Sequence, residues 1–289
     1  MIPSSLYSKL FLTAVIMFFV SATEEPVWGE QASVPATDWT SREIVRFRAI
    51  EANQGVAVDE EFFYAIDNRR IGKYRKVNGE KVAEWKDEQG GSFIHLNSGF
   101  IKDGKLIVSH SNFPGVPMFS SVEIWDIKTM KHIGSHSFGI GPGSLTWIAY
   151  RNGFQYACFA DYTGGSGNPG KGPAYTQLVR YDDQWRAVGG WGFPAELVQK
   201  FGNSSASCGA FGPGGLLYVT GHDAKEIYVL DFPKGGSILQ WIATIPAPLE
   251  GQAFSWDPER EHVVYGIVRK TKEVVVFEIE PGSGVLPKF

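Results

Sequence analysis

Three of the six histidines offer a means of proton transfer. His95, His110 and His222 each lie at one end of a short apolar segment, among other polar residues. Imidazole is a common general acid or base near neutral pH and the commonest metal ligand. We therefore take His110 and His222, with the carboxylate of Asp161, as candidate catalytic residues. The three histidines together would also suit a divalent metal ion with an open position, whereas each histidine taken singly could simply form a loop hydrogen bond.

Polar residues near the same segment ends could hold a substrate. Arg269 provides a two-pronged donor that suits a carboxylate or phosphate, and its alternative role is an ion pair with Glu250 or Asp67. Trp147 could form a flat wall for a sugar or lactone ring, although core packing is the commoner use of such an aromatic residue. The full set of candidate substrate-binding residues is Asn97, Ser144, Trp147, Glu250, Gln252 and Arg269.

A repeated pattern indicates which elements position these residues. An apolar strand, a turn, a second aromatic strand and a polar cluster recur, starting at residues 54, 97, 144, 207 and 251. A third strand follows every unit, and a fourth follows all but the last. Groups of four strands at a period of roughly 40–50 residues are typical of β-propeller blades. A β-sandwich is the alternative, but it does not predict five matching units.

The missing strand of the last unit can come from the other end of the chain. Residues 43–50 (EIVRFRAI) alternate between polar and apolar side chains and precede the first unit. Sealing the ring with this strand removes an exposed sheet edge. The sequence therefore predicts an all-β, five-bladed β-propeller closed by the N-terminal strand, as one domain over residues 43–289.

Propeller topology gathers the candidate residues on one rim. The first strand of each blade lines the central channel, so the start of that strand and the end of the second strand open on the same face. The candidate residues fall at these positions in successive blades. Two loops after second strands, 112–120 and 162–175, are longer than the others. We expect them to cover one side of the channel mouth, since insertions tend to gather on the binding face.

The N-terminal segment is typical of a secretory signal peptide. Lys9 precedes an apolar stretch from Leu10 to Val20, and small residues follow through Ala22. This stretch is too short to span a bilayer, which needs about 20 apolar residues. We expect residues 1–22 to be a signal peptide and 23–42 a linker. The mature protein would then be exported to the periplasm or the extracellular space, free of the membrane.

Composition and absent motifs narrow the class of protein. With 27 Lys and Arg against 31 Asp and Glu, the chain lacks the basic excess of a nucleic-acid binder. It contains no nucleophile-elbow, phosphate-loop or dinucleotide pattern. We therefore expect no nucleotide, flavin or haem, and one divalent metal ion as the only candidate cofactor. Cys158 and Cys208 are expected to be buried thiols, although the sequence leaves open whether they pair.

Several segments resemble a bacterial group of β-propeller proteins that carry the label "cycloisomerase". The segments are EANQGVAVDEEFFYAIDNRRIGKYRK (51–76), SHSNFPGVPMFSSVEIWD (109–126), SHSFGIGPGSLTW (135–147), FGPGGLLYVTGHDAKEIYVLDFP (211–233) and EGQAFSWDP (250–258). The resemblance runs from about residue 43 to residue 280. The label points to lactone-forming muconate cycloisomerases, some of which are also propellers.

The residues favour an exported enzyme that acts on a small polar ring compound bearing a carboxylate, such as a sugar acid or a lactone. A rim histidine would transfer a proton in an isomerase, lyase or lactone hydrolase reaction, with or without a metal ion. The alternative is a glycan- or ligand-binding propeller without turnover, which would have several equivalent sites. The polar clusters differ from blade to blade, which favours one asymmetric site. A scaffold for protein partners is a third possibility, for which the sequence shows no dedicated surface.

Overall fold

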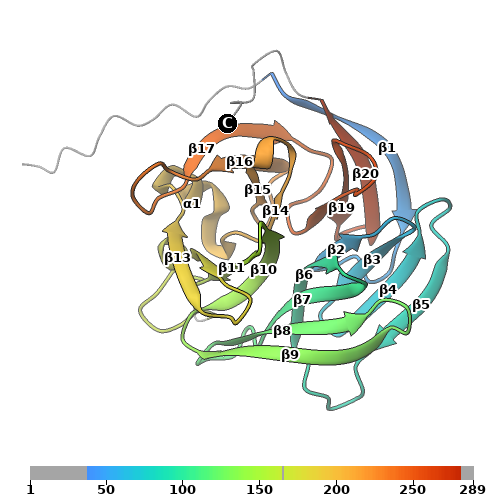
Figure 1. Ribbon diagram of the computed structural model, residues 1–289, viewed down its shortest axis with the longest axis horizontal. Helices are drawn as coiled ribbons and strands as arrows, with labels where there is room; N and C mark the ends of the chain where they lie inside the picture. Colours follow the sequence, from blue (N-terminus) through green and yellow to red (C-terminus); the bar gives the residue numbers. More distant parts are fainter. Residues whose placement is uncertain (1–37, 165, 281–289) are drawn as a thin grey trace, which may run out of the picture. The chain divides into compact units, whose positions relative to one another are not determined.

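Short strands joined by tight turns build almost the whole described chain. The computed structural model describes residues 38–164 and 166–280. In this part, the strands form five four-stranded antiparallel sheets, which surround one axis (Figure 1). The first strands of neighbouring sheets contact one another in a ring. The fold is therefore the predicted all-β, five-bladed propeller. The predicted signal peptide (1–22) and most of the predicted linker lie outside the described residues.

Each blade is a meander whose strands step away from the axis in chain order, except in the last blade. The first four blades are β2–β5 (Gly55–Val58, Phe62–Asp67, Arg70–Arg75, Lys81–Lys86), β6–β9 (His95–Lys102, Lys105–Ser111, Phe119–Asp126, Lys131–Ile140), β10–β13 (Ser144–Arg151, Phe154–Ala160, Gln177–Tyr181, Ala187–Gly192) and β14–β17 (Cys208–Phe211, Leu217–Thr220, Glu226–Asp231, Gln240–Pro246). The fifth blade combines β18 (Phe254–Trp256), β19 (Val263–Val268) and β20 (Glu273–Glu280) with the N-terminal strand β1 (Thr40–Arg48).

The ring is closed by the N-terminal strand, as predicted. Strand β1 pairs antiparallel with β20, from Thr40 opposite Glu280 to Arg48 opposite Glu273. Figure 1 shows the two ends of the described chain side by side, β1 in blue and β20 in red. The strand begins three residues before the predicted position, within the predicted linker. This pairing satisfies the outer edge of β20, which would otherwise offer unpaired backbone groups to another chain.

The apolar core lies between neighbouring blades. Inner strands such as β19 are buried along their whole length, because a blade covers each of their faces. The outermost strands, such as β9, alternate between exposed and partly buried side chains. Cys158 and Cys208 are buried free thiols in this core, as expected. Cys208 Sγ lies 3.1 Å from Ser98 Oγ of the second blade.

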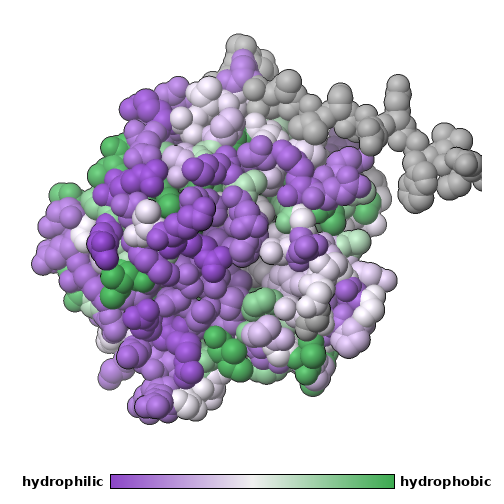
Figure 2. Space-filling view, turned by 180° about the vertical axis from the view of Figure 1, so that it is seen from behind, coloured by the Kyte–Doolittle hydropathy of each residue, from purple (hydrophilic) through white to green (hydrophobic). Residues whose placement is uncertain are grey.

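Helical structure is confined to connections in the described part. It comprises the α-helix α1 (Ala195–Phe201) and the 3₁₀ helices η1 (Pro173–Tyr175), η2 (Gly202–Ser204) and η3 (Pro213–Gly215). None of the described helices has the length and hydrophobicity that crossing a bilayer requires. On the face shown in Figure 2, hydrophilic side chains predominate and hydrophobic ones are scattered.

Candidate functional site

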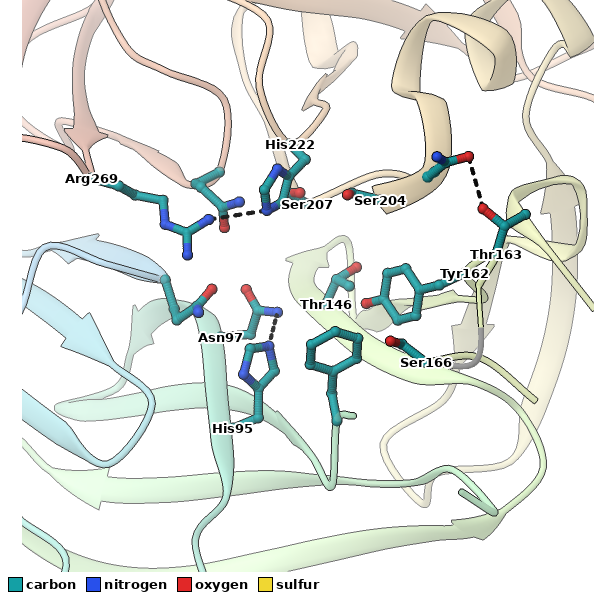
Figure 3. A pocket seen from close by; sticks show the side chains of 14 residues that line it. His95, Asn97, Thr146, Tyr162, Thr163, Ser166, Ser204, Ser207, His222 and Arg269 are labelled. Carbon is teal, nitrogen blue, oxygen red and sulfur yellow. Dashed lines mark hydrogen bonds between the residues drawn. The ribbon is translucent and has the colours of Figure 1, made fainter. Parts of the chain in front are cut away.

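One polar pocket opens at the end of the ring where first strands begin and second strands end. Its cavity volume is about 200 Å³, which is below the roughly 300–1,000 Å³ of sites for drug-sized ligands and suits a small one. Its lining residues are Gln54, His95, Asn97, Phe113, Thr146, Tyr162, Thr163, Ser166, Asn203, Ser204, Ser207, His222, Gln252 and Arg269. Figure 3 shows their side chains arranged around a common space. The predicted convergence on one rim thus holds for His95, Asn97, His222, Gln252 and Arg269.

Asp223, His222 and Arg269 form a hydrogen-bonded line at one side of the pocket. His222 Nδ1 lies 2.7 Å from Asp223 Oδ1, and His222 Nε2 lies 3.0 Å from Arg269 Nη1 (Figure 3). A guanidinium only donates hydrogen bonds, so Nε2 must accept from Arg269. The ring proton is therefore on Nδ1, which donates to Asp223. The two neighbours together fix the tautomer and the orientation of the imidazole.

Gly251 brings these residues together from two different blades. His222 follows β15 of the fourth blade, whereas Arg269 follows β19 of the fifth blade. Gly251, in the loop before β18, has a positive φ of 62°. A Cβ atom there would lie 2.3 Å from the backbone carbonyl of His222. Only glycine permits this close approach, which seats the loop of the fifth blade against His222.

Aromatic rings form the opposite wall. The ring of Phe113 lies 5.1 Å from the ring of His95 and 5.0 Å from the ring of Tyr162, centroid to centroid. Phe113 and Tyr162 belong to the two long loops that were expected to cover one side of the mouth. His95 Nε2 lies 3.5 Å from the amide Nδ2 of Asn97 (Figure 3). This wall presents ring faces and one amide rather than charged groups.

The pocket lining favours a negatively charged ligand. No Asp or Glu is among the described residues that line it, whereas Arg269 contributes a permanent positive charge. Burial, with His110 and Arg269 nearby, lowers the pKa of His95 to about 4, so that imidazole is neutral at pH 7. Neither predicted ion pair of Arg269 forms, because Glu250 lies 3.7 Å from Lys270 and Asp67 lies 2.8 Å from Arg70. Arg269 is thus available to an anion.

The structure places His110, a predicted catalytic base, outside the pocket lining. The backbone N–H of Ile94 donates to His110 Nε2 at 3.1 Å, so Nδ1 carries the proton and donates to Ser121 Oγ at 2.9 Å. Ser121 donates in turn to Glu123 at 2.6 Å, and Glu123 also accepts from His132 at 2.8 Å. Both nitrogens of His110 are therefore occupied in a buried chain that does not line the pocket. Burial lowers the pKa of His110 to about 4.

The predicted metal triad does not assemble. His110 is committed to the chain from Ile94 to His132, while the Nε2 atom of His222 accepts from Arg269. Among residues 38–164 and 166–280, no group of three or more His, Cys, Asp or Glu side chains is placed to hold a metal ion. His95 and His222 both line the pocket, but they lack the third ligand that the prediction assigned to His110.

Three further predicted residues, Asp161, Ser144 and Glu250, lie outside the pocket lining. Asp161 is buried and accepts a hydrogen bond from Asn168 at 2.9 Å, which links it to the long loop 162–175. Ser144 is fully buried, with its hydroxyl 2.8 Å from that of Ser111. Glu250 lies in an adjoining depression on the rim.

Trp147 packs in the core rather than forming a wall for a ring. Its side chain is fully buried in the cluster between the third and fourth blades. Gly209 lies so close that a Cβ atom there would be 2.6 Å from the indole. Thr146, the preceding residue on β10, lines the pocket instead. Successive residues of a strand face opposite sides, which separates the two.

Sequence reasoning did not include Phe113 or several hydroxyl and amide residues of the pocket among the candidate site residues, and it gave Asp223 no role as the partner of His222. Phe113 lies in the loop 112–120, whose unusual length was the available signal for it. Asp223 directly follows His222, and adjacent Asp and His residues at a strand end are such a signal as well. No sequence pattern distinguishes Asn203 or Ser204, both of which enter the pocket from η2.

Comparisons with known proteins show the fold alone. No protein-family model matches the sequence, and no curated protein sequence matches it. The chain is similar in structure to Myxococcus xanthus glutaminyl cyclase, at 10% identity, with 86% of this chain and 98% of that chain covered and a TM-score of 0.57. It is also similar to a luciferin-regenerating enzyme, at 10% identity, with coverage of 83% and 96% and a TM-score of 0.50. The chain is a five-bladed propeller that resembles these propeller enzymes at low sequence identity.

Proposed function

We propose that this protein is an enzyme that binds a small ring compound with a carboxylate group and transfers a proton on it. The single observation that carries this proposal is the line from Asp223 through His222 to Arg269, set in a pocket whose described lining contains no acid. A base oriented by a carboxylate and an adjacent guanidinium are what proton abstraction next to a carboxylate requires. The resemblance to cycloisomerase-labelled propellers and the two similar enzyme structures agree with this class of function.

Arg269 holds the carboxylate in this proposal. Its guanidinium has no acidic partner within salt-bridge distance among the described residues, so an incoming carboxylate does not have to break an existing ion pair. A bidentate guanidinium–carboxylate pair is among the stronger hydrogen-bonded pairs in proteins. Asn97, Ser207 and Gln252 line the same pocket and can bind hydroxyl or carbonyl groups of the ligand.

His222 acts as the general base. Asp223 accepts the Nδ1 proton at 2.7 Å and stabilises the imidazolium that forms when Nε2 takes a proton from the substrate. The proton leaves a substrate carbon or a water, and His222 then returns it to the product. Isomerisation, elimination and lactone hydrolysis all begin with such a proton transfer. The same arrangement of Asp223, His222 and Arg269 would serve each of these reactions.

The aromatic wall accounts for the preference for a ring. Phe113, flanked by His95 and Tyr162, offers a ring face opposite the Arg269 side of the pocket. The C–H faces of sugar and lactone rings pack on such surfaces while their polar edges reach hydrogen-bonding groups. A ligand held in this way has its carboxylate at Arg269 and its apolar face on Phe113.

One observation favours the alternative of ligand binding without turnover. In the structure, Arg269 already occupies the Nε2 lone pair that a base would need. A binding protein would retain this contact, whereas an enzyme must release it. The two functions therefore differ in what His222 does when the ligand is present.

Binding and proton transfer can be measured separately. A panel of uronic acids, aldonic acids and their lactones would be tested by calorimetry, with the matching neutral sugars as controls. Exchange of ring protons with D₂O, followed by ¹H NMR, reports proton transfer even when no net product accumulates. We expect His222→Gln to lower exchange by roughly 10²–10⁴-fold while retaining binding.

The matched variants are Arg269→Gln, which should abolish carboxylate binding, and Lys270→Gln, which removes one charge from the same rim and should change little. Equal binding of neutral and acidic sugars would refute the proposed substrate class. Tight binding of an acid without exchange or product would establish the binding protein instead.

A further inference from the structure

We propose that Arg269 is a latch on His222, which the carboxylate of the ligand releases. In the free protein the guanidinium occupies the lone pair of the base. When a carboxylate binds Arg269, the lone pair becomes free and lies beside the bound group. This inference deepens the proposed function, on which its choice of ligand rests. It adds a specific role for Arg269: the residue both recognises the anion and controls the base.

The hydrogen-bond directions establish the latched state. Arg269 Nη1 lies 3.0 Å from His222 Nε2 and can only donate. Asp223 Oδ1 lies 2.7 Å from Nδ1 and, as a carboxylate, can only accept. Each ring nitrogen thus has one partner, and neither is free to take a proton from a substrate. The imidazole is oriented for catalysis but its base nitrogen is occupied.

In this state Arg269 donates to an uncharged acceptor, although carboxylates lie on the same rim. Acidic groups lie on the same rim, yet they pair elsewhere: Asp223 with His222, and Glu250 with Lys270 at 3.7 Å. Within the described chain, the hydrogen-bond partner of the Arg269 side chain is a neutral imidazole. A bidentate pair between a guanidinium and a carboxylate adds a second hydrogen bond and the attraction of opposite charges, which the single bond to a neutral imidazole lacks. A ligand carboxylate therefore displaces His222 from Arg269, whereas a hydroxyl group does not.

Release leaves the base in a defined state. Asp223 lies on the far side of the ring from Arg269 and keeps the proton on Nδ1, so the freed atom is Nε2. This atom begins within 3.0 Å of the guanidinium, and His222 lines the pocket next to Arg269 (Figure 3). A carboxylate seated on Arg269 therefore places its neighbouring carbon closest to the base. The latch thus selects the proton on the carbon adjacent to the carboxylate as the one transferred.

Backbone contacts beside the latch hold the loops that carry His222 and Arg269 against each other. Gly251 allows the loop of the fifth blade to rest on the backbone of His222, at a distance that no other residue permits. The backbone N–H of Gln252 donates to the carbonyl oxygen of Gly221 at 3.0 Å, which joins the same two loops. Arg269 and His222 therefore meet because these contacts join the fourth and fifth blades next to them. Only the two side chains need to separate when a ligand binds.

The experiment uses ¹⁵N-histidine-labelled protein and NMR at a pH where His222 is neutral, with its signals assigned by their loss in His222→Gln. We expect the wild-type Nε2 resonance to show an accepted hydrogen bond. In Arg269→Gln it should move toward the position of an unbonded nitrogen, while Nδ1 remains protonated. Arg269→Lys keeps a charged donor and should retain part of the wild-type shift. An unchanged Nε2 resonance in Arg269→Gln would overturn the latch.

Acetate is the probe for release, with sodium chloride at equal ionic strength as its control. Acetate should move the wild-type Nε2 resonance toward that of Arg269→Gln, and should have no effect in Arg269→Gln itself. Lys270→Gln, which removes an adjacent charge, should respond as the wild type does. If acetate leaves Nε2 unchanged, release by a carboxylate is refuted. If acetate moves it but no acid of the panel is turned over, the latch stands and the proposed enzyme function fails.

Discussion

The buried imidazole of His110 predicts a loss of stability in mild acid. Burial lowers its pKa to about 4 from an ordinary value near 6.5. Between these two values the unfolded chain binds a proton that the folded chain refuses, so the free energy of unfolding falls as the pH falls. The stabilisation is complete above pH 6.5 and is lost progressively towards pH 4. Between pH 7 and pH 4.5, protonation of this one group should lower the free energy of unfolding by about 2 kcal/mol.

The assay is urea unfolding followed by tryptophan fluorescence at several pH values between 4.5 and 7.5. Carboxylates also titrate in acid, so the informative quantity is the difference in pH dependence between the wild type and His110→Gln. The variant should be less stable at pH 7, because the chain from Ile94 to Ser121 is disturbed, but its stability should fall less steeply. His262, which is partly exposed and lies outside this hydrogen-bonded chain, replaced by Gln serves as the control. Parallel curves for the wild type and His110→Gln would refute the assignment of a buried, neutral imidazole.

Two further predictions concern packing. Gly251→Ala should separate the loops that carry His222 and Arg269, since its Cβ atom would lie 2.3 Å from the His222 carbonyl. The free energy of unfolding should fall by about 1–3 kcal/mol through strain at a positive φ, and ligand affinity should fall because the two side chains no longer meet. An unchanged affinity would contradict this account of the rim. Trp147→Ala should lower the free energy of unfolding by about 3–5 kcal/mol through loss of core packing, and Trp147→Phe by less; a variant that stays stable but loses ligand binding would restore the role as a substrate wall.

The architecture of this protein was predictable because each blade repeats one hydrophobic pattern. Five starts at matching positions and one missing outer strand were sufficient to predict both the ring and its closure, which β1 and β20 confirm. The rim was predictable for the same reason, since strand direction alone determines which ends meet. These predictions depend on the order of the strands and the period of the repeat. Neither changes when a single residue is assigned wrongly.

The sequence predicted the orientation of individual side chains less well than it predicted the fold. His110 lies between Ser109 and Ser111 on β7, and each step along a strand reverses the face. A shift of one residue therefore decides between the pocket and the interior of a blade. Register shifts occur in both relevant pairs, between Leu96 and Gly99 and between Leu145 and Trp147. The sequence pattern does not reveal such bulges, so His110 was placed on the wrong side. For Trp147 the pattern left a substrate wall open beside core packing, and the structure shows core packing.

The N-terminal segment that closes the ring also contacts the turn that carries Arg269. The turn from β19 to β20 carries Arg269 and ends at Lys272, whose carbonyl oxygen accepts a hydrogen bond from the backbone N–H of Ala49, just after β1, at 2.9 Å. Lys272 Nζ also donates to Asn53 Oδ1 at 2.8 Å, farther along the same N-terminal segment. The strand that seals the propeller therefore also fastens the turn from which the guanidinium projects. The ring fixes the backbone of this turn, so the proposed release of His222 requires an arriving anion to move only one side chain.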